Sequence, residues 1–248
     1  MIAVVIAAYD EVENIKPLTE RLVQTLDSLP GASWKLIYVI EGTDGTVEAA
    51  REFATRRPEI QVLYQEQASG LGRAFRRGFG ALPPETDFVV TMDADLNHQP
   101  EEIPRLLQVL QQQKADIVIG SRRVQASSDE GTPVWKLALS QFGNRMMHIF
   151  MGLRIRDLTS GYRIYRLRVL RQITFDNMGF AFLPEILIQA GARGFRIVEE
   201  PIRFVFRTSG ESKMHIVAVG FSYLKLFATH IQPGFLRRLW SSPPAAES

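Results

Sequence analysis

The chain has 248 residues, of which 46% are hydrophobic, and it carries a formal net charge of +2 and no cysteine. This length fits one large α/β domain or two small ones. The lack of cysteine excludes disulfides and thiolate metal sites, and the small net charge argues against nucleic acid as a partner. No run of about 18 uncharged apolar residues occurs, so the sequence contains no clear transmembrane span.

Strands and helices are expected to alternate over the first half of the chain. Apolar runs rich in β-branched residues predict buried strands over residues 2–9, 35–40, 60–64, 87–90 and 116–120. Helical patterns predict helices over residues 15–29, 69–82 and 100–113, and a further helix that ends near residue 57. Strands that alternate with helices of this length indicate βαβ units and a mostly parallel sheet.

The second half of the chain is expected to complete the same domain. The predicted elements there are a helix over residues 134–151, a short strand after the turn at 157–163, a helix over 180–192 and a strand-like segment over 195–206. Pro201 places the last of these at a sheet edge or a bulge, because proline cannot donate to a strand ladder. No repeat or internal boundary is found, so we predict one domain over residues 1–213, followed by a helix and tail over 214–248.

Polar or glycine residues follow four of the predicted strands, where a parallel sheet binds its ligands. These strand ends are Tyr9-Asp10-Glu11, Glu41-Gly42, Asp93-Ala94-Asp95 and Gly120-Ser121-Arg122. We expect them to converge on one crevice. A dinucleotide-binding site is excluded, because the first strand–helix turn has no glycine and Gly70-Leu71-Gly72 lacks a third glycine at the required spacing.

The central motif is the segment from Thr91 to His98, which directly follows an apolar strand. Asp93 and Asp95 can both reach one divalent cation, and Asn97 can add an amide oxygen. Mg²⁺ and Mn²⁺ prefer such oxygen ligands, together with substrate phosphates. The alternative is a solvated turn, which is the commoner meaning of so short a pattern.

Taken together, the motifs resemble those of family-2 glycosyltransferases of the dolichol-phosphate mannose synthase type. The matching segments are Ala7 to Glu11, Asp44-Gly45-Thr46, Gly70 to Ala74, Asp93 to Glu101, Gly120-Ser121-Arg122, Thr159 to Arg163, and Arg207 with Ser212-Lys213. Three features depart from the family pattern. The first motif lacks its proline, Gln99 follows His98, and Glu41-Gly42 supplies one carboxylate where the family usually has two aspartates.

The resemblance implies a fold and an activity. The fold would be a single glycosyltransferase-A type domain, with a Rossmann-like, mostly parallel sheet, flanking helices and a C-terminal apolar helix. The activity would be a metal-dependent, inverting transfer of a sugar, mannose above all, from a nucleotide-diphosphate sugar such as GDP-mannose to a polyprenyl (dolichyl) phosphate. The alternatives are transfer of glucose or another sugar, a sugar hydroxyl as acceptor, and a non-catalytic scaffold that binds nucleotide sugars.

The resemblance also implies roles for individual residues. The donor would be bound by Ala8, Tyr9, Glu11, Glu41, Asp44, Asp93, Ala94, Asp95, Arg122, Arg207 and Lys213. The metal, Mg²⁺ or Mn²⁺, would be held by Asp93, Asp95 and Asn97. The acceptor phosphate would be held by Arg163 with Lys136 and Ser140, which we place by their helical spacing rather than by a motif; the alternative for these two is a solvated helix face. The catalytic residues would be Asp95, Arg122 and Arg163. Glu185 and Asp157 are the candidate bases if the acceptor is a hydroxyl, and His98 and His148 are expected to be structural.

The segment from Ile216 to Ile231 predicts a broadly apolar helix with a narrow polar stripe formed by Ser222, Lys225 and Thr229. Such a helix suits the lipid headgroup region. We therefore expect peripheral attachment to a membrane surface, at its cytoplasmic face, without a span. The alternative is packing against the domain or against a partner membrane subunit.

Overall fold

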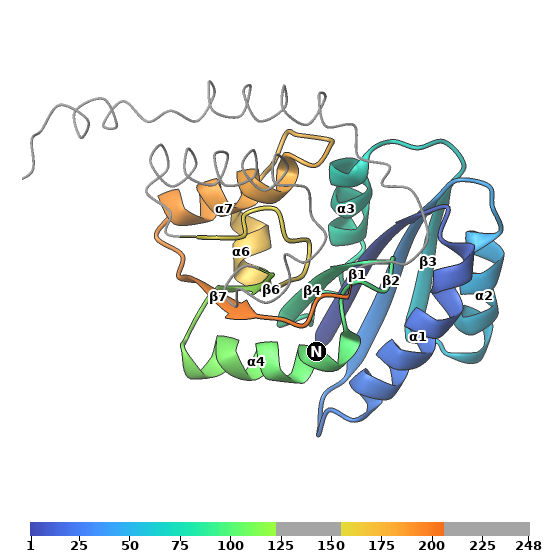
Figure 1. The fold of residues 1–248 in the computed structure, drawn as a ribbon, viewed down its shortest axis with the longest axis horizontal. Helices are drawn as coiled ribbons and strands as arrows, with labels where there is room; N and C mark the ends of the chain where they lie inside the picture. The colour runs from blue at the N-terminus through green and yellow to red at the C-terminus, as the bar shows by residue number, and fades with distance from the viewer. Residues whose placement is uncertain (123–154, 206–248) are drawn as a thin grey trace, which may run out of the picture.

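A seven-stranded sheet forms the centre of the protein, whose computed structural model describes residues 1–122 and 155–205 (Figure 1). Its strands are β1 (Ile2–Tyr9), β2 (Trp34–Glu41), β3 (Ile60–Gln65), β4 (Phe88–Asp93), β5 (Ile117–Ser121), β6 (Arg163–Arg166) and β7 (Ile197–Pro201). Their order across the sheet is β3-β2-β1-β4-β6-β5-β7. The order changes direction between β1 and β4, which is where open α/β sheets form their ligand crevice.

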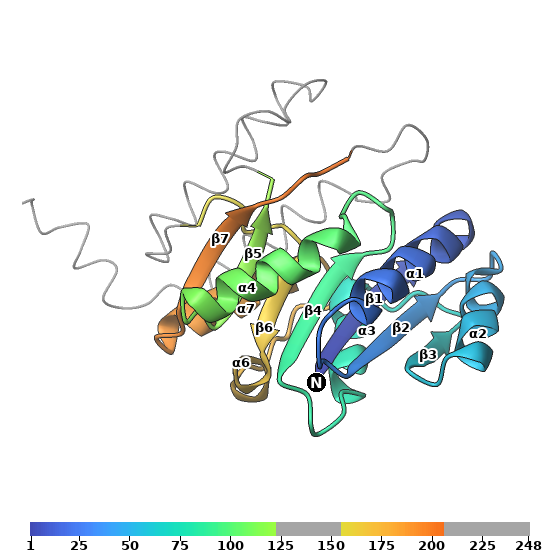
Figure 2. The same cartoon turned by 90° about the horizontal axis from the view of Figure 1, so that it is seen from below.

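All the neighbouring strands in the described sheet pair in parallel, except that β6 runs antiparallel to both β4 and β5. The prediction of a mostly parallel sheet is therefore confirmed. Because β6 is reversed, its first residue lies at the same edge as the last residues of β4 and β5 (Figure 2). The turn that precedes β6 is thereby brought to the ligand edge of the sheet.

Helices cover both faces of the sheet (Figures 1 and 2). On one face lie α1 (Val12–Asp27), α2 (Thr46–Arg56), the short 3₁₀ helix η1 (Pro100–Glu102) and α4 (Ile103–Gln112). On the other lie α3 (Leu71–Gly80), α6 (Leu167–Gln172) and α7 (Phe182–Ala192). Alternate strand residues serve the two layers, as the pleat requires: Val4 and Ile6 pack with the first group, and Val5 packs with the second.

Most of the predicted elements are confirmed to within a few residues at their ends. β7 lies at the edge of the sheet and ends at Pro201, as expected for a strand with proline. The sequence did not predict α6, which is only six residues long. The helices predicted over 134–151 and 216–231 lie outside the described residues. Among the helices that the structure does describe, none combines the length and apolar character needed to cross a bilayer.

Helix α3 approaches the sheet closely at Gly78. A Cβ atom built on Gly78 would overlap Cγ1 of Val5 and would lie 3.1 Å from Cγ2 of Val39. Only hydrogen fits between this helix and strands β1 and β2. The close approach therefore fixes how far α3 lies from the sheet, and with it the position of its first residues at the ligand edge.

We predict that Gly78→Ala lowers the free energy of unfolding by about 1–3 kcal/mol, because the new methyl group overpacks the interface between α3 and the sheet. Gly80→Ala is the matched control in the same helix, since no atom of the residues that the structure describes lies within 4 Å of a Cβ at that position. It should leave stability unchanged or raise it by up to about 1 kcal/mol. Urea unfolding of both variants makes the comparison, and equal stabilities would contradict the close approach.

Candidate active site

Three side chains at neighbouring strand ends form the floor of the candidate site. Tyr9 on β1 is the register partner of Glu41 on β2, and Asp93 on β4 pairs with the residue two positions before Tyr9. Successive side chains of a strand point to opposite faces of the sheet, and by this alternation all three lie on the face that is covered by α3 rather than on the face covered by α1. Tyr9 is 43% exposed and Glu41 is buried. The ends of β1, β2 and β4 therefore converge on one edge, as predicted.

The loop after β4 orients the Asp95 carboxylate. Asn97 donates its backbone N–H to Oδ1 of Asp95 at 3.2 Å and its Nδ2 to Oδ2 at 2.7 Å. Leu96 adopts a left-handed conformation with a φ of 61°, which turns the chain back toward Asp95. The Oδ1 atom of Asn97 is buried and has no hydrogen-bond partner among the described residues. The loop that carries the two aspartates thus also carries a buried amide oxygen.

This donor set fits a divalent cation. The described residues contain no group of three or more His, Cys, Asp or Glu side chains placed to hold a metal. Two carboxylates and an amide oxygen are nevertheless typical of Mg²⁺ sites that are completed by water and by substrate phosphates. Asp93, Asp95 and Asn97 are the residues that would hold the ion.

His98 fixes the backbone of the metal motif from inside the protein. Its ring lies between Tyr162 and Phe204, with centroid separations of 5.1 and 5.6 Å. Its Nδ1 accepts the backbone N–H of Asp93 at 3.2 Å. Burial lowers the pKa of His98 to about 4, and the nearby Arg122 guanidinium acts in the same direction. The acidic neighbours Asp95 and Asp157 act to raise this pKa, but they are outweighed. The ring is therefore neutral near pH 7, and His98 has the structural role that we expected.

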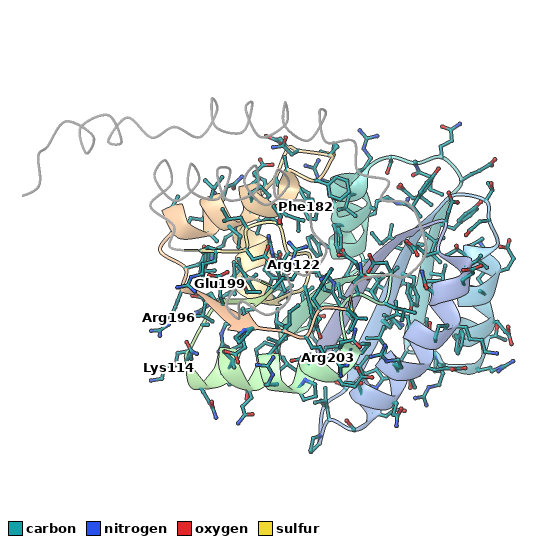
Figure 3. The ribbon with its side chains drawn as sticks, viewed as in Figure 1. Lys114, Arg122, Phe182, Arg196, Glu199 and Arg203 are labelled. Atoms are coloured by element: carbon teal, nitrogen blue, oxygen red, sulfur yellow. The ribbon has the colours of Figure 1, made fainter. Side chains whose placement is uncertain are left out.

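Arg122, at the end of β5, is held in place by a buried carboxylate. Its Nε and Nη2 atoms donate to Asp157 at 2.8 and 2.7 Å, and its backbone N–H donates to the same carboxylate at 3.1 Å. Nη2 also donates to Thr159 at 2.9 Å. Asp157 is wholly buried, whereas the Arg122 side chain is 30% exposed. In Figure 3 Arg122 lies within the outline of the molecule, whereas Lys114 and Arg196 project from its outer side.

The turn that precedes β6 joins the metal motif to Arg122. A Cβ atom on Gly161 would lie 2.7 Å from Oδ1 of Asp93, so the glycine leaves room for that carboxylate. Thr91 donates its hydroxyl to the Gly161 carbonyl at 2.8 Å, and Ser160 donates to the Gly120 carbonyl at 2.7 Å. The same turn carries the carboxylate that holds Arg122. One short segment therefore fixes the ends of β4 and β5 relative to each other.

Arg163 was predicted to bind the acceptor phosphate and to act in catalysis, and the structure corrects this prediction. Its side chain is fully buried, with 0% exposure. Its guanidinium donates to the carbonyls of Leu158 and Leu183, both at 2.7 Å, and of Ser160 at 2.8 Å. A phosphate could reach this guanidinium only by displacing those carbonyls. Arg163 is instead the cation that ties the turn before β6 to α7.

Glu41 was predicted to line the donor pocket, and its carboxylate already has internal partners. Ser69 donates its backbone N–H to Glu41 at 2.9 Å, and its hydroxyl bonds to the other carboxylate oxygen. Nη1 of Arg77 lies 4.0 Å from the same carboxylate. The residue therefore fixes the loop before α3, at the edge where Tyr9 is exposed. The bond between Ser69 and Glu41 could not be predicted from the sequence, because the two residues are 28 positions apart.

Asp44 joins the loop before α2 to the start of α1. Its Oδ1 accepts the backbone N–H of Thr46 at 3.0 Å, and its Oδ2 accepts that of Val12 at 3.1 Å. Burial acts to raise the pKa of Asp44, but the hydrogen bonds from Thr46 and Val12 outweigh it and lower that pKa. The hydroxyl of Thr46 accepts the backbone N–H of Glu11 at 2.8 Å. The Asp-Gly-Thr motif thus holds two loops of the ligand edge together.

The remaining predicted site residues fall into two groups. Ala8 and Ala94 are buried, each 3% exposed. Lys136, Ser140, Arg207 and Lys213 lie outside the described residues.

A Rossmann-like sheet with an Asp-x-Asp loop at the end of its central strand, and with an oriented arginine after a neighbouring strand, is the arrangement expected of a glycosyltransferase-A type fold. The sequence matches glycosyl transferase family 2 over residues 3–174, and the chain belongs to that family. It is accordingly a glycosyltransferase.

Two relatives and one solved structure resemble this chain. The chain is 39% identical over 220 residues to the undecaprenyl-phosphate mannosyltransferase of Micrococcus luteus, covering 87% of this chain and 88% of that protein. It is 35% identical over 217 residues to the polyprenol monophosphomannose synthase of Mycolicibacterium smegmatis, covering 85% and 80%. Glucosyl-3-phosphoglycerate synthase from Mycobacterium tuberculosis, solved with Mn²⁺, UDP-glucose and glycerol 3-phosphate, has a TM-score of 0.65 and 21% identity, over 92% of this chain and 78% of that one. This last likeness shows a shared fold.

We predict that Arg163→Met destabilises the protein by about 3 kcal/mol or more, because three buried carbonyls lose their donors. Arg166→Met, on the same strand, is the matched control. Arg166 is half-buried, and among the described residues its guanidinium donates to one carbonyl, that of Ala115. Its replacement should cost about 1 kcal/mol. Denaturant unfolding gives both values. A stable Arg163→Met variant with weakened acceptor binding would restore the phosphate-binding role.

Proposed function

We propose that this protein transfers a mannosyl residue, with inversion, from a nucleoside-diphosphate sugar to a polyprenyl monophosphate. GDP-mannose is the proposed donor, and Mg²⁺ or Mn²⁺ is the proposed cofactor. The names of the two relatives, at 39% and 35% identity, support both the sugar and the class of acceptor. The neighbour of similar fold that was solved with Mn²⁺ supports a divalent cation.

The observation that carries the proposal is the joint placement of Asp93 and Arg122. The turn before β6 contacts the Asp93 carboxylate through Gly161 and holds Arg122 through Asp157. A sugar nucleotide leaves as a diphosphate whose negative charge grows during transfer. The bound cation would neutralise that charge as a Lewis acid. Arg122 would bind the same oxygens with a guanidinium that is already oriented, so that little side-chain freedom is lost.

The burial of the candidate bases favours a phosphate acceptor. A sugar hydroxyl needs a positioned general base, whereas a phosphate monoester, with a second pKa of about 6, is already anionic at pH 7. Asp157 is wholly buried and accepts hydrogen bonds from Arg122. Glu185 is 2% exposed and accepts hydrogen bonds from Asp176 and Asn177. Both of the carboxylates that we considered as a base are thus buried and already accept hydrogen bonds.

Cations suit the acceptor site, because an anionic nucleophile needs to be held in line rather than deprotonated. With Arg163 in the core, the proposed ligands of the acceptor phosphate are Lys136 and Ser140. Arg207 and Lys213 are proposed to bind the donor. The nucleoside is proposed to lie beside Tyr9, where the ring is exposed for contact with a base.

We predict that Asp95→Asn lowers transfer by more than about 100-fold and leaves the fold intact, because the charge that develops on the diphosphate is no longer neutralised. Asp87→Asn is the matched control. Asp87 directly precedes β4 and so lies at the opposite end of that strand from the metal motif. Its carboxylate binds the N-terminal amine at 2.6 Å. The assay uses labelled GDP-mannose and UDP-glucose, with a polyprenyl phosphate in detergent and Mg²⁺ or Mn²⁺.

Gly161→Ala provides a second variant for the same experiment. Its methyl group would push the Asp93 carboxylate aside, so transfer should fall while the thermal melting temperature stays near that of the wild type. Full transfer in the presence of EDTA would contradict the metal site. Equal loss in the Asp87→Asn control would show that the assay reports stability instead.

We further propose that the protein attaches peripherally to the cytoplasmic face of a membrane through residues 214–248. The apolar character of the predicted helix from Ile216 to Ile231 and the lipid acceptors named for the relatives support this. A chain that ends at Met214 should therefore lose flotation with anionic liposomes, while retaining turnover of a short-chain, water-soluble polyprenyl phosphate. Undiminished flotation of the shortened chain would contradict the proposal.

A further inference from the structure

The turn over residues 176–178 lies against the first residues of α3. Gly72 donates its backbone N–H to the Met178 carbonyl at 2.8 Å. A Cβ atom on Gly70 would lie 2.7 Å from that carbonyl, and a Cβ atom on Gly72 would overlap the Asn177 carbonyl. The two glycines at the start of α3 therefore leave room for this turn.

Glu185, in the first turn of α7, holds the same turn from inside the protein. Its side chain is 2% exposed. Its carboxylate accepts the backbone N–H groups of Asp176 and Asn177, both at 3.0 Å, and Nδ2 of Asn177 at 2.7 Å. An ionised carboxylate is purely an acceptor, so it suits a point where three donors converge. Helix α7 is in turn packed on α3, since the rings of Phe182 and Phe75 stack with their centroids 5.2 Å apart.

The start of α3 is also connected to the floor of the candidate site. Gly70 directly follows Ser69, whose backbone N–H and hydroxyl both bond to the Glu41 carboxylate. Glu41 is the register partner of Tyr9. A displacement of the first residues of α3 would therefore act on Ser69 and, through its two bonds, on the Glu41 carboxylate.

We propose that Glu185 is a positioning residue for the nucleotide part of the donor. It fixes the turn at 176–178, the turn fixes the start of α3, and Ser69 then orients Glu41 beside Tyr9. Glu185 is buried and acts through these contacts rather than by touching the substrate. The inference rests on the proposed function, because it takes the Tyr9 and Glu41 end of the sheet as the nucleoside site.

The variant that tests this role is Glu185→Gln, which keeps the size of the side chain but turns an NH₂ group toward a backbone N–H. The KM for the nucleotide sugar should rise about tenfold, with kcat at saturating donor within about twofold of the wild-type value. The KM for the polyprenyl phosphate should not change. Calorimetric titration with GDP and UDP should show nucleotide binding weakened by the same factor as the donor KM.

Gly72→Ala disturbs the same turn from the other side without altering Glu185, and should give the same change in donor KM. Asp116→Asn is the matched control, because Asp116 is another buried carboxylate, 6% exposed, that accepts a backbone N–H, that of Arg196, at 2.9 Å. Asp116 directly precedes β5 and so lies at the opposite edge of the sheet. Asp116→Asn should lower the melting temperature and leave the donor KM unchanged.

The outcomes separate the two proposals. Equal changes of donor KM in Glu185→Gln and Asp116→Asn would overturn the positioning role, as would nucleotide binding that Glu185→Gln leaves unaltered. If Glu185→Gln does not fold, Gly72→Ala decides alone, and an unchanged donor KM in that variant would overturn the inference. A wild-type protein that binds no nucleoside diphosphate would contradict the proposed function and the positioning role with it.

Discussion

The pairing of the wholly buried Asp157 carboxylate with Arg122 is the interaction on which the ligand edge of the sheet depends. A carboxylate inside a protein is tolerated only when its oxygens are hydrogen-bonded and its charge is paired. Here the guanidinium and the backbone N–H of Arg122 satisfy both requirements. The backbone N–H of Asp157 donates to Glu199 on β7 at 2.8 Å. One buried acid therefore holds the end of β5, the turn before β6 and the edge strand β7 together.

Buried carboxylates that accept backbone N–H groups occur at other points of the ligand edge. Glu41, Asp157 and Glu185 are all buried, and each accepts at least one backbone N–H from a neighbouring loop. Loops beyond the ends of strands cannot use the sheet ladder to satisfy their backbone groups, so side-chain acceptors take over. Charge-assisted hydrogen bonds of this kind are stronger than neutral ones and are directional. The loops that surround the proposed donor are thus held rigidly, although they contain little regular structure.

The sequence predicted the strands well and the roles of charged residues less well, for a physical reason. Continuous apolar runs such as that of β1 have one interpretation as buried strands, and their polar ends identify the ligand edge. The role of an arginine depends instead on which way a short strand faces. Arg122 and Arg163 both lie in polar motifs near that edge, yet the register of β6 directs only Arg163 into the core. A strand of four residues carries too short a pattern to reveal its direction or its register.

The contact between His98 and the backbone of Asp93 makes the geometry of the metal motif depend on pH. The pKa of His98 is about 4 in the folded protein, against an ordinary value of 6.5, because the ring is buried. Between about pH 4 and 6.5, His98 is therefore protonated in the unfolded chain and neutral in the folded chain. This contribution to stability is complete above about pH 6.5 and is lost as the pH falls through about 4, a change of about 3 kcal/mol. A protonated ring can no longer accept the Asp93 amide, so mild acid would loosen the end of β4 before the rest of the sheet.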